Sequence, residues 1–269
     1  MTMCYHSLKI PIIVLGLSLS TAFARADAPE SVEADVSARS VAITSSFSGT
    51  EIIVFGAVEN SKQPSAEAGT YDVVVVVEGA SKPVAVRKKS NVVGLWINTQ
   101  TMLFASFPSY YAITSTRPID EITDAGTRDK NEIGFDHVRM VPAGRSRTLF
   151  SDPEEVNAFR EAAIRLKQRD RLYVTNDYGV TFIGRSLFRS TITLPPNVPV
   201  GPLTARVYLL REGKLLSQYE SNVVLERTGV ERLLYDSAFH RPWLYGLGTL
   251  LMAALAGLSA AFVFRRAVQ

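Results

Sequence analysis

In this sequence of 269 residues, few side chains have the spacing of a catalytic or metal-binding motif. The three histidines, His6, His137 and His240, lie far apart, whereas a zinc-binding pair on one helix or hairpin is closely spaced. Cys4 is the sole cysteine. The sequence contains no phosphate-binding glycine loop and no nucleophile elbow. We therefore expect neither a metal site nor a bound cofactor.

Two pairs of adjacent carboxylates could still serve acid–base chemistry: Asp120 with Glu121, and Glu154 with Glu155. A glycosidase needs two carboxylates that face each other across the substrate. Two carboxylates that are adjacent in sequence do not have that geometry by virtue of their spacing. The ordinary explanation of both pairs is that they are exposed acids in a turn or at the start of a helix. A hydrolase or carbohydrate-active domain stays open as an alternative function.

The densest aromatic cluster consists of Phe104, Phe107, Tyr110 and Tyr111, and Arg117 follows it. A groove lined by these rings would bind a ligand or a partner, with Tyr110, Tyr111 and Arg117 as the candidate binding residues. Core packing is the default alternative, because large aromatic side chains dominate sandwich interiors.

The elements that must position these residues are mostly β-strands. Val32, Ala34 and Val36 alternate with acidic residues, which predicts a half-buried strand. The five consecutive valines at 73–77 predict a strand buried on both faces, because β-branched side chains favour an extended backbone. Gly56 is interpreted as a bulge within a further strand. Short separate strands are expected at 82–86, 94–97 and 102–107, with Trp96 in the core.

The last two strands are typical of the end of a sandwich. A proline-rich connection at 195–202 precedes an alternating strand, and the segment 211–214 then turns the chain back. This hairpin resembles the closing strands of an immunoglobulin-like fold, although the Cys…Trp…Cys set is missing. We predict a mainly β protein, an immunoglobulin-like antiparallel sandwich with a helical insertion at about 116–175. Two sandwich units are the alternative to one.

One helix is expected inside that insertion. Asp152 is placed to cap it and Pro153 to open it, because proline fits the first helical position, where the N–H has no helical partner. The apolar side chains that follow recur on one face of a helix, namely Val156, Phe159, Ala163 and Leu166.

The two ends of the chain indicate export and membrane anchoring. Residues 1–24 combine Lys9, an apolar run and an Ala22-Phe23-Ala24 cleavage pattern, which predicts a signal peptide, with Ala26 as a second possible cut. Residues 242–264 predict a transmembrane helix, since they are uncharged and end at Arg265-Arg266. The segment 230–241 before it is amphipathic and could lie along the membrane surface. These ends predict a periplasmic bulk and a cytoplasmic C-terminus.

Small residues recur every fourth position in the predicted span. They form one ridge along a helix, and such ridges let two helices approach closely inside a bilayer. This predicts a helix-packing surface for a membrane-protein partner or for a second copy of the chain. The ridge consists of Thr249, Ala253, Gly257 and Ala261.

Charge argues against a nucleic-acid partner. Lys and Arg number 29 and Asp and Glu 26, with 46% hydrophobic residues and a mean hydropathy of +0.10. Without Lys9, Arg265 and Arg266 the exported part holds 26 basic and 26 acidic residues. We find no basic stripe, so we expect no polyanion-binding surface.

Several segments resemble the family of alphaproteobacterial putative transmembrane proteins of unknown function. They are Phe47-Ser48-Gly49-Thr50-Glu51 with Phe55-Gly56, Pro108-Ser109-Tyr110-Tyr111-Ala112, Arg117-Pro118, and Tyr245-Gly246 before the span. The resemblance covers essentially the whole chain. It implies a Gram-negative inner membrane and, loosely, neighbouring permeases of the sulfite-exporter type, and it supplies no active-site residues.

These observations favour a membrane-anchored periplasmic interaction or accessory protein without catalytic activity, and the resemblance implies such a permease as its partner. The alternative is a membrane-tethered periplasmic hydrolase or carbohydrate-active domain. A deep acidic cleft would favour the enzyme, whereas an exposed apolar patch would favour binding. The predicted layout is a signal peptide at 1–24, a periplasmic β-rich domain at 25–229, a juxtamembrane segment at 230–241, a transmembrane helix at 242–264 and a cytoplasmic tail at 265–269.

Overall fold

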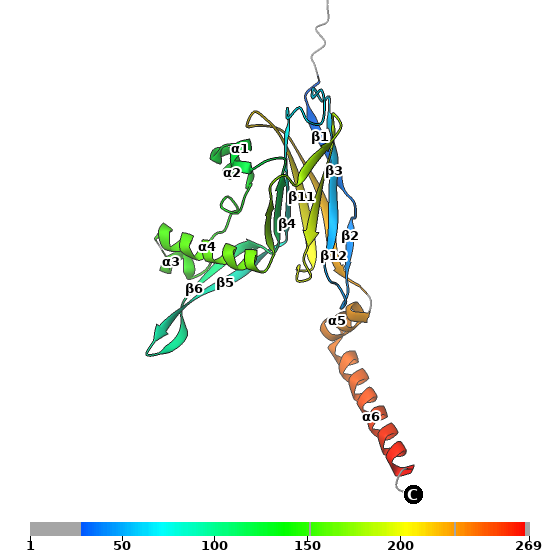
Figure 1. The fold of residues 1–269 in the computed structure, drawn as a ribbon. Helices are drawn as coiled ribbons and strands as arrows, with labels where there is room; N and C mark the ends of the chain where they lie inside the picture. The colour runs from blue at the N-terminus through cyan, green and yellow to red at the C-terminus, as the bar shows by residue number, and fades with distance from the viewer. Residues whose placement is uncertain (1–27, 151, 229, 267–269) are drawn as a thin grey trace, which may run out of the picture.

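The computed structural model describes residues 28–150, 152–228 and 230–266. The predicted signal peptide and its cleavage positions lie outside the described residues, as do the last three residues of the predicted tail. Figure 1 shows an elongated β-sandwich with helices on one side and a long helix, α6, that leaves from one end.

Two sheets form the sandwich. The first contains four strands in the order β1-β3-β10-β9, and all its pairs are antiparallel. The second contains six in the order β2-β12-β11-β4-β7-β8, with parallel pairs only at its edges, β2 with β12 and β7 with β8. The mainly β sandwich is therefore confirmed, with two parallel edge strands that the sequence did not indicate. The strand bounds are β1 Ser31–Val36, β2 Ser40–Ile43, β3 Thr50–Glu59, β4 Asp72–Gly79, β7 Tyr111–Ser115, β8 Tyr173–Asn176, β9 Val180–Ile183, β10 Leu187–Leu194, β11 Gly201–Arg211 and β12 Lys214–Arg227.

Gly56 is a point of close contact rather than a bulge. It pairs in register with Ala34 on one side and Phe188 on the other, with no shift in either ladder. A Cβ atom at this position would lie 2.4 Å from the Glu33 carbonyl oxygen and 2.6 Å from the Phe188 ring. The predicted bulge is therefore wrong, and glycine is required because the neighbouring strand and ring approach the backbone.

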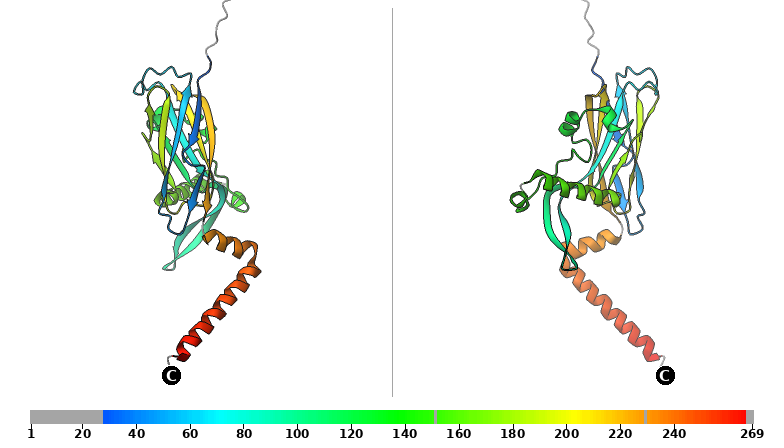
Figure 2. Two further views of the ribbon diagram at one scale, coloured as in Figure 1. Left: turned by 90° about the vertical axis from the view of Figure 1, so that its right-hand side faces the viewer. Right: turned by 60° about the vertical axis from the view of Figure 1, so that its left-hand side comes forward.

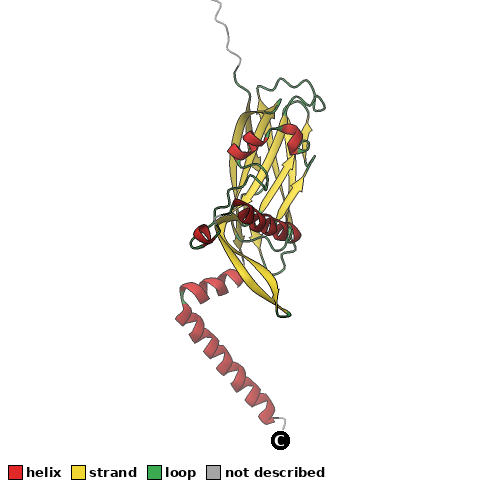
Figure 3. Cartoon of the chain, turned by 90° about the vertical axis from the view of Figure 1, so that its left-hand side faces the viewer, coloured by secondary structure: helices red, strands yellow, loops and turns green. Residues whose placement is uncertain are grey.

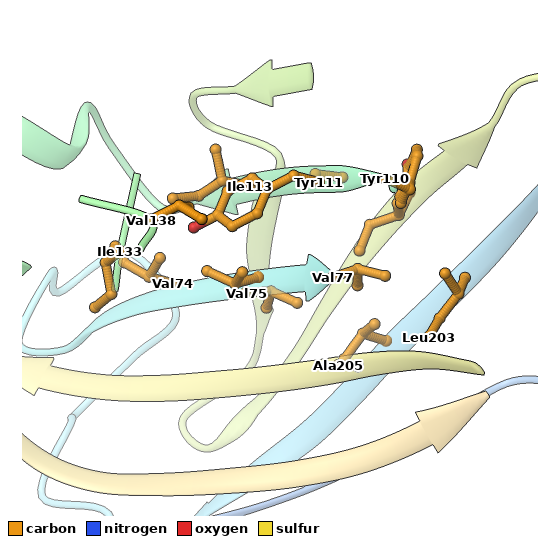
Figure 4. Packing of buried hydrophobic residues seen from close by; sticks show 14 of the residues in the cluster. Val74, Val75, Val77, Tyr110, Tyr111, Ile113, Ile133, Val138, Leu203 and Ala205 are labelled. Atoms are coloured by element: carbon orange, nitrogen blue, oxygen red, sulfur yellow. The ribbon is translucent and has the colours of Figure 1, made fainter. Parts of the chain in front are cut away.

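The valine run of β4 is buried on both faces, as predicted, because a different layer covers each face. Thr114 pairs with Val75 and its hydroxyl lies 2.6 Å from that of Ser190 in β10, so this face packs on the four-stranded sheet. The opposite face carries Val74 and Val76 beside Ile113, under the segment that contains Ile133. Figure 4 shows Tyr111 and Ile113 directed toward Ile133 and Val138 of that segment.

Four helices and the intervening loops form the insertion that covers this second face (Figure 3). They are α1 Ile119–Ile122, α2 Ala125–Asn131, α3 Ser146–Leu149 and α4 Pro153–Arg169. The Asp152 side chain accepts the Glu154 N–H, which confirms the predicted cap. Phe159 and Ala163 are buried as expected, but Leu166 is 48% exposed and Ile164 is buried in its place. The Arg160 guanidinium donates to the carbonyls of Phe135, Asp136 and Val138 and so ties α4 to the loop before it.

A long two-stranded hairpin replaces the short strands expected between residues 82 and 107. It consists of β5 Ser81–Val92 and β6 Leu95–Pro108 and stands away from the sandwich (Figure 2). Val93 and Gly94 connect the strands with φ of 52° and 84°, the positive values that a two-residue type I′ turn requires. The Asn91 carboxamide oxygen accepts the Gly94 N–H at 2.8 Å. The turn and this hydrogen bond allow β5 and β6 to pair along their whole length as one hairpin.

The chain leaves the sandwich through two helices set at an angle, α5 Val230–His240 and α6 Pro242–Arg266 (Figure 1). Arg241 separates them, at the boundary that the sequence predicts. Residues 242–261 of α6 are long and apolar enough to cross a membrane, and the window is wholly exposed.

Candidate functional site

The two predicted binding tyrosines lie in the core, on opposite faces of the six-stranded sheet. The Tyr110 hydroxyl donates to the Thr193 carbonyl, 3.0 Å away in β10. The Tyr111 hydroxyl donates to the Glu132 carbonyl and accepts the Gly134 N–H, each at 3.0 Å. Both rings are fully buried, and burial raises the pKa of both hydroxyls. Their placement is that of packing residues, and their binding role stays a prediction.

Arg117, the third predicted binding residue, forms an ion pair beside β4. Its Nε and Nη2 donate to the two oxygens of Asp72, both at 2.8 Å. The Thr116 hydroxyl donates to the same carboxylate at 3.1 Å. These hydrogen bonds raise the pKa of the Arg117 guanidinium. Arg117 is thus oriented by Asp72 and does not share a surface groove with the two tyrosines.

The adjacent carboxylates do not face one another. Asp120 pairs with Arg128, and Glu121 lies 4.0 Å from the Arg117 guanidinium. Glu154 and Glu155 occupy the first turn of α4, and the Glu155 carboxylate accepts the Gln100 amide at 3.0 Å. Within residues 28–150, 152–228 and 230–266, no group of three or more His, Cys, Asp or Glu could hold a metal ion.

An apolar surface covers the outer face of the four-stranded sheet. We call it the outer-face patch and define it as Ile53, Phe55, Ile183 and Leu187, all exposed large hydrophobic residues. Leu187 pairs with Ile183, and β10 pairs with β3 beside it, so the four side chains share one face. Phe55 is 47% exposed and Leu187 53%. A depression of about 700 Å³ lies over these residues.

Charged and polar side chains accompany the outer-face patch: Glu33, Asp35 and Tyr219 form its rim, and Arg189, the cross-strand partner of Phe55, stands within it. The Asp35 carboxylate accepts the Val36 N–H at 2.8 Å and the Ser221 hydroxyl at 3.2 Å. These hydrogen bonds lower its pKa, the Val36 bond most, so the rim stays negatively charged at this position near neutral pH. The sequence signal that could have revealed this surface is the run Ile52–Phe55, which is apolar on both faces of a strand.

A second apolar surface lies at the tip of the β5–β6 hairpin. We call Val92, Val93, Leu95, Trp96 and Ile97 the hairpin tip, and every one of them is exposed. Val93 is 98% exposed and Trp96 69%, so the prediction that Trp96 lies in the core is wrong. Trp96 pairs with Asn91 near the end of the hairpin, where no third strand lies beside β5 or β6.

The hairpin also concentrates positive charge. Lys82, Arg87, Lys88 and Lys89 are exposed, and the segment from Ser81 to Pro108 contains no acidic residue. The even balance of charge over residues 25–264 therefore conceals a local basic cluster. Strand pairing brings this cluster and the hairpin tip together in one projecting element.

The small-residue ridge forms on α6 as the spacing predicts. Thr249, Ala253, Gly257 and Ala261 are all exposed, and a Cβ atom at Gly257 would meet no atom within 4 Å. The ridge therefore remains available for packing, and its role stays a prediction.

Fold and surfaces define a β-sandwich domain joined to one candidate transmembrane helix near its C-terminus. Residues 31–266 match the family Alph_Pro_TM, described as "Putative transmembrane protein". The chain belongs to this family, whose function is unknown, and the expected resemblance is confirmed. No curated protein matches the sequence.

Proposed function

We propose that this chain is a membrane-anchored interaction or accessory protein that presents its outer-face patch to a protein partner. The patch carries the proposal, because contiguous exposed apolar side chains rimmed by charged ones are the usual composition of a binding surface. Phe55 supplies its aromatic anchor, a residue type enriched in the centres of interfaces. The carboxylates that line depressions of the described residues share them with basic side chains: Asp124 and Glu212 with Lys130 and Lys214, and Glu78 and Glu220 with Arg206.

The proposed location is a bacterial inner membrane, with the sandwich in the periplasm and the C-terminus in the cytoplasm. The predicted signal peptide and the arginines that end α6 support this topology. A reporter that works only in the cytoplasm is expected to be active when fused after Gln269. A periplasm-specific reporter is expected to be active when inserted at Gly69, an exposed turn with no atom near its Cβ position. The opposite pattern would overturn the topology.

The proposed partner is a membrane protein, with a permease of the sulfite-exporter type favoured over a second copy of the chain. Two surfaces would serve one complex: the outer-face patch outside the bilayer and the small-residue ridge within it. Close helix approach at the ridge suits a multispanning protein, since small residues at helix interfaces drive packing in lipid.

The test is site-specific photo-crosslinking in native membranes, with the reactive residue at Phe55 and, as control, at Tyr178. Tyr178 is an aromatic residue outside the patch, on the β8–β9 turn, and it is 65% exposed against 47% for Phe55. We expect a discrete crosslinked protein from position 55 and not from position 178. Leu187→Ser should reduce that product several-fold, whereas Tyr178→Ser should leave it unchanged. Equal labelling from both positions would show that the patch has no dedicated partner.

A further inference from the structure

We propose that the β5–β6 hairpin is a second membrane contact: its tip enters the headgroup–acyl boundary of the bilayer that α6 spans, and its basic cluster binds anionic lipid headgroups. The occupant of this surface is therefore lipid.

The strand register places the root of the hairpin at the end of the sandwich from which the chain leaves toward α6. β4 ends at Gly79, which pairs with Leu203, and Leu203 pairs with Val223 of β12. β12 ends shortly afterwards at Arg227, before α5. The hairpin and α5 therefore start from the same end of the molecule.

The hairpin then points in the direction of the membrane helix. In each of the views, which are turned about one vertical axis, its tip reaches the level at which α5 joins α6 (Figures 1, 2 and 3). The first turn of α6 carries Trp243 and Tyr245, both exposed, and these residue types gather at the membrane–water boundary. The hairpin tip, which contains Trp96, thus lies level with the start of α6, the helix whose first turn carries these aromatic residues.

The side chains of the tip suit lipid better than water. Five exposed apolar residues within six positions include Trp96, whose ring and N–H favour a site that is apolar on one side and wet on the other. Val93 occupies the turn with φ of 52°, a value that is strained for a β-branched residue and that asparagine or glycine would adopt more easily. Val93 therefore adds exposed apolar surface to the tip, although its backbone conformation makes the turn less stable than asparagine or glycine would.

The charges lie where headgroups would be. Lys89 precedes Val92 by three residues, which is about 10 Å along a strand. Arg87 and Lys88 continue the cluster away from the tip, and β5 and β6 contain no acid. The Glu155 carboxylate of α4 lies at Gln100, the cross-strand partner of Lys88, so Lys89 is the cation of this group nearest the tip. A tip buried at the acyl boundary would place these cations among the phosphate groups of anionic lipids, which attract lysine and arginine side chains near the membrane surface.

Attachment at two points would fix the orientation of the sandwich on the membrane. A single helix leaves a domain free to rotate and tilt about its linker. The hairpin would hold the outer-face patch at one height and direction. Contact between the hairpin and lipid does not require the proposed protein partner.

The experiment uses the full chain with Cys4→Ser, purified and reconstituted into vesicles of phosphatidylcholine alone or mixed with phosphatidylglycerol. An environment-sensitive fluorophore is attached through Val93→Cys. The matched control is Glu212→Cys, which occupies the corresponding position of the β11–β12 turn with φ of 49°, at the opposite end of β12 from α5. Lipids with a quencher near the headgroup report contact with the bilayer.

We expect quenching at position 93 to exceed that at position 212 several-fold in the mixed vesicles, and to weaken in high salt. The double substitution Lys88→Glu and Lys89→Glu should also weaken it, with an unchanged far-UV spectrum showing that the fold is intact. Equal quenching at positions 93 and 212 would overturn the proposal. So would shielding of position 93 that occurs in native membranes but not in pure lipid, since that result would identify a protein as the occupant.

Discussion

Arg117 and Asp72 form a two-pronged ion pair in which each carboxylate oxygen accepts one guanidinium N–H at 2.8 Å. The Asp72 side chain is 8% exposed and that of Arg117 41%. The pair ties the start of α1 to the first residue of β4. The hydrogen bonds to Asp72 therefore fix the orientation of the Arg117 side chain.

Loss of this pair should cost stability. We expect Arg117→Met to lower the free energy of unfolding by about 1–3 kcal/mol, because it leaves a buried carboxylate without its main partner. Arg39→Met is the control, since Arg39 and Asp35 form an exposed pair at 3.7 Å, a kind worth about 0–1 kcal/mol. Urea unfolding measures both. Equal effects of the two substitutions would show that the Arg117 pair is not structural.

Gly56→Ala should destabilise the four-stranded sheet. The new methyl group would collide with the Glu33 carbonyl and the Phe188 ring, and such overpacking costs about 1–3 kcal/mol. Gly126→Ala in α2 is the matched control. Its Cβ would meet only the Asp124 carboxylate at 3.2 Å, and alanine favours a helix by up to about 1 kcal/mol. Thermal unfolding should separate the two, and a neutral Gly56→Ala would contradict the close approach.

Glu78 should make stability depend on pH. Burial raises the pKa of its carboxyl group above the ordinary value of 4.5, and the paired Arg206 guanidinium opposes part of this rise. The folded chain then keeps a proton that the unfolded chain has lost, so the free energy of unfolding falls as pH rises from 4.5 through the raised pKa.

Glu78→Gln does not titrate and should lack this fall. The test is the difference in unfolding free energy between wild type and Glu78→Gln, measured from pH 4 to 7 so that other groups cancel. The stability of wild type relative to the variant should decrease as pH rises. A difference that stays constant, or that grows with pH, would mean that the pKa of Glu78 is not raised.

Gly257→Ile tests the small-residue ridge of α6. Isoleucine would block close approach of a second helix while preserving hydrophobicity, so membrane insertion should persist and recovery of the partner should fall several-fold. Contacts of this type are worth about 1 kcal/mol each. Ser259→Ile on the opposite side of the helix is the control. The same yield of co-purified partner from both variants and wild type would leave the ridge without a role.

Local patterns in the sequence were sufficient for some of the individual elements. The alternation in β1 and the valine run of β4 predict their burial, and Asp152 predicts the start of α4, because backbone period and capping depend on neighbours in sequence. The helix at 242–264 follows from composition alone. The family resemblance rests on short segments of the same kind.

Contacts between distant residues decided the rest. Tyr110 and Tyr111 are neighbours in the sequence with the same side chain, yet they fill two different layers. Tyr111 begins β7 and its hydroxyl bonds the insertion, whereas the Tyr110 hydroxyl, just before the strand, bonds Thr193 of the other sheet. Trp96 is exposed because its hairpin extends beyond every layer that could cover it, and Phe55 is exposed because no third layer covers the four-stranded sheet among the described residues. Exposure depends on which elements cover one another. Tertiary structure therefore revealed both apolar surfaces, and sequence patterning did not.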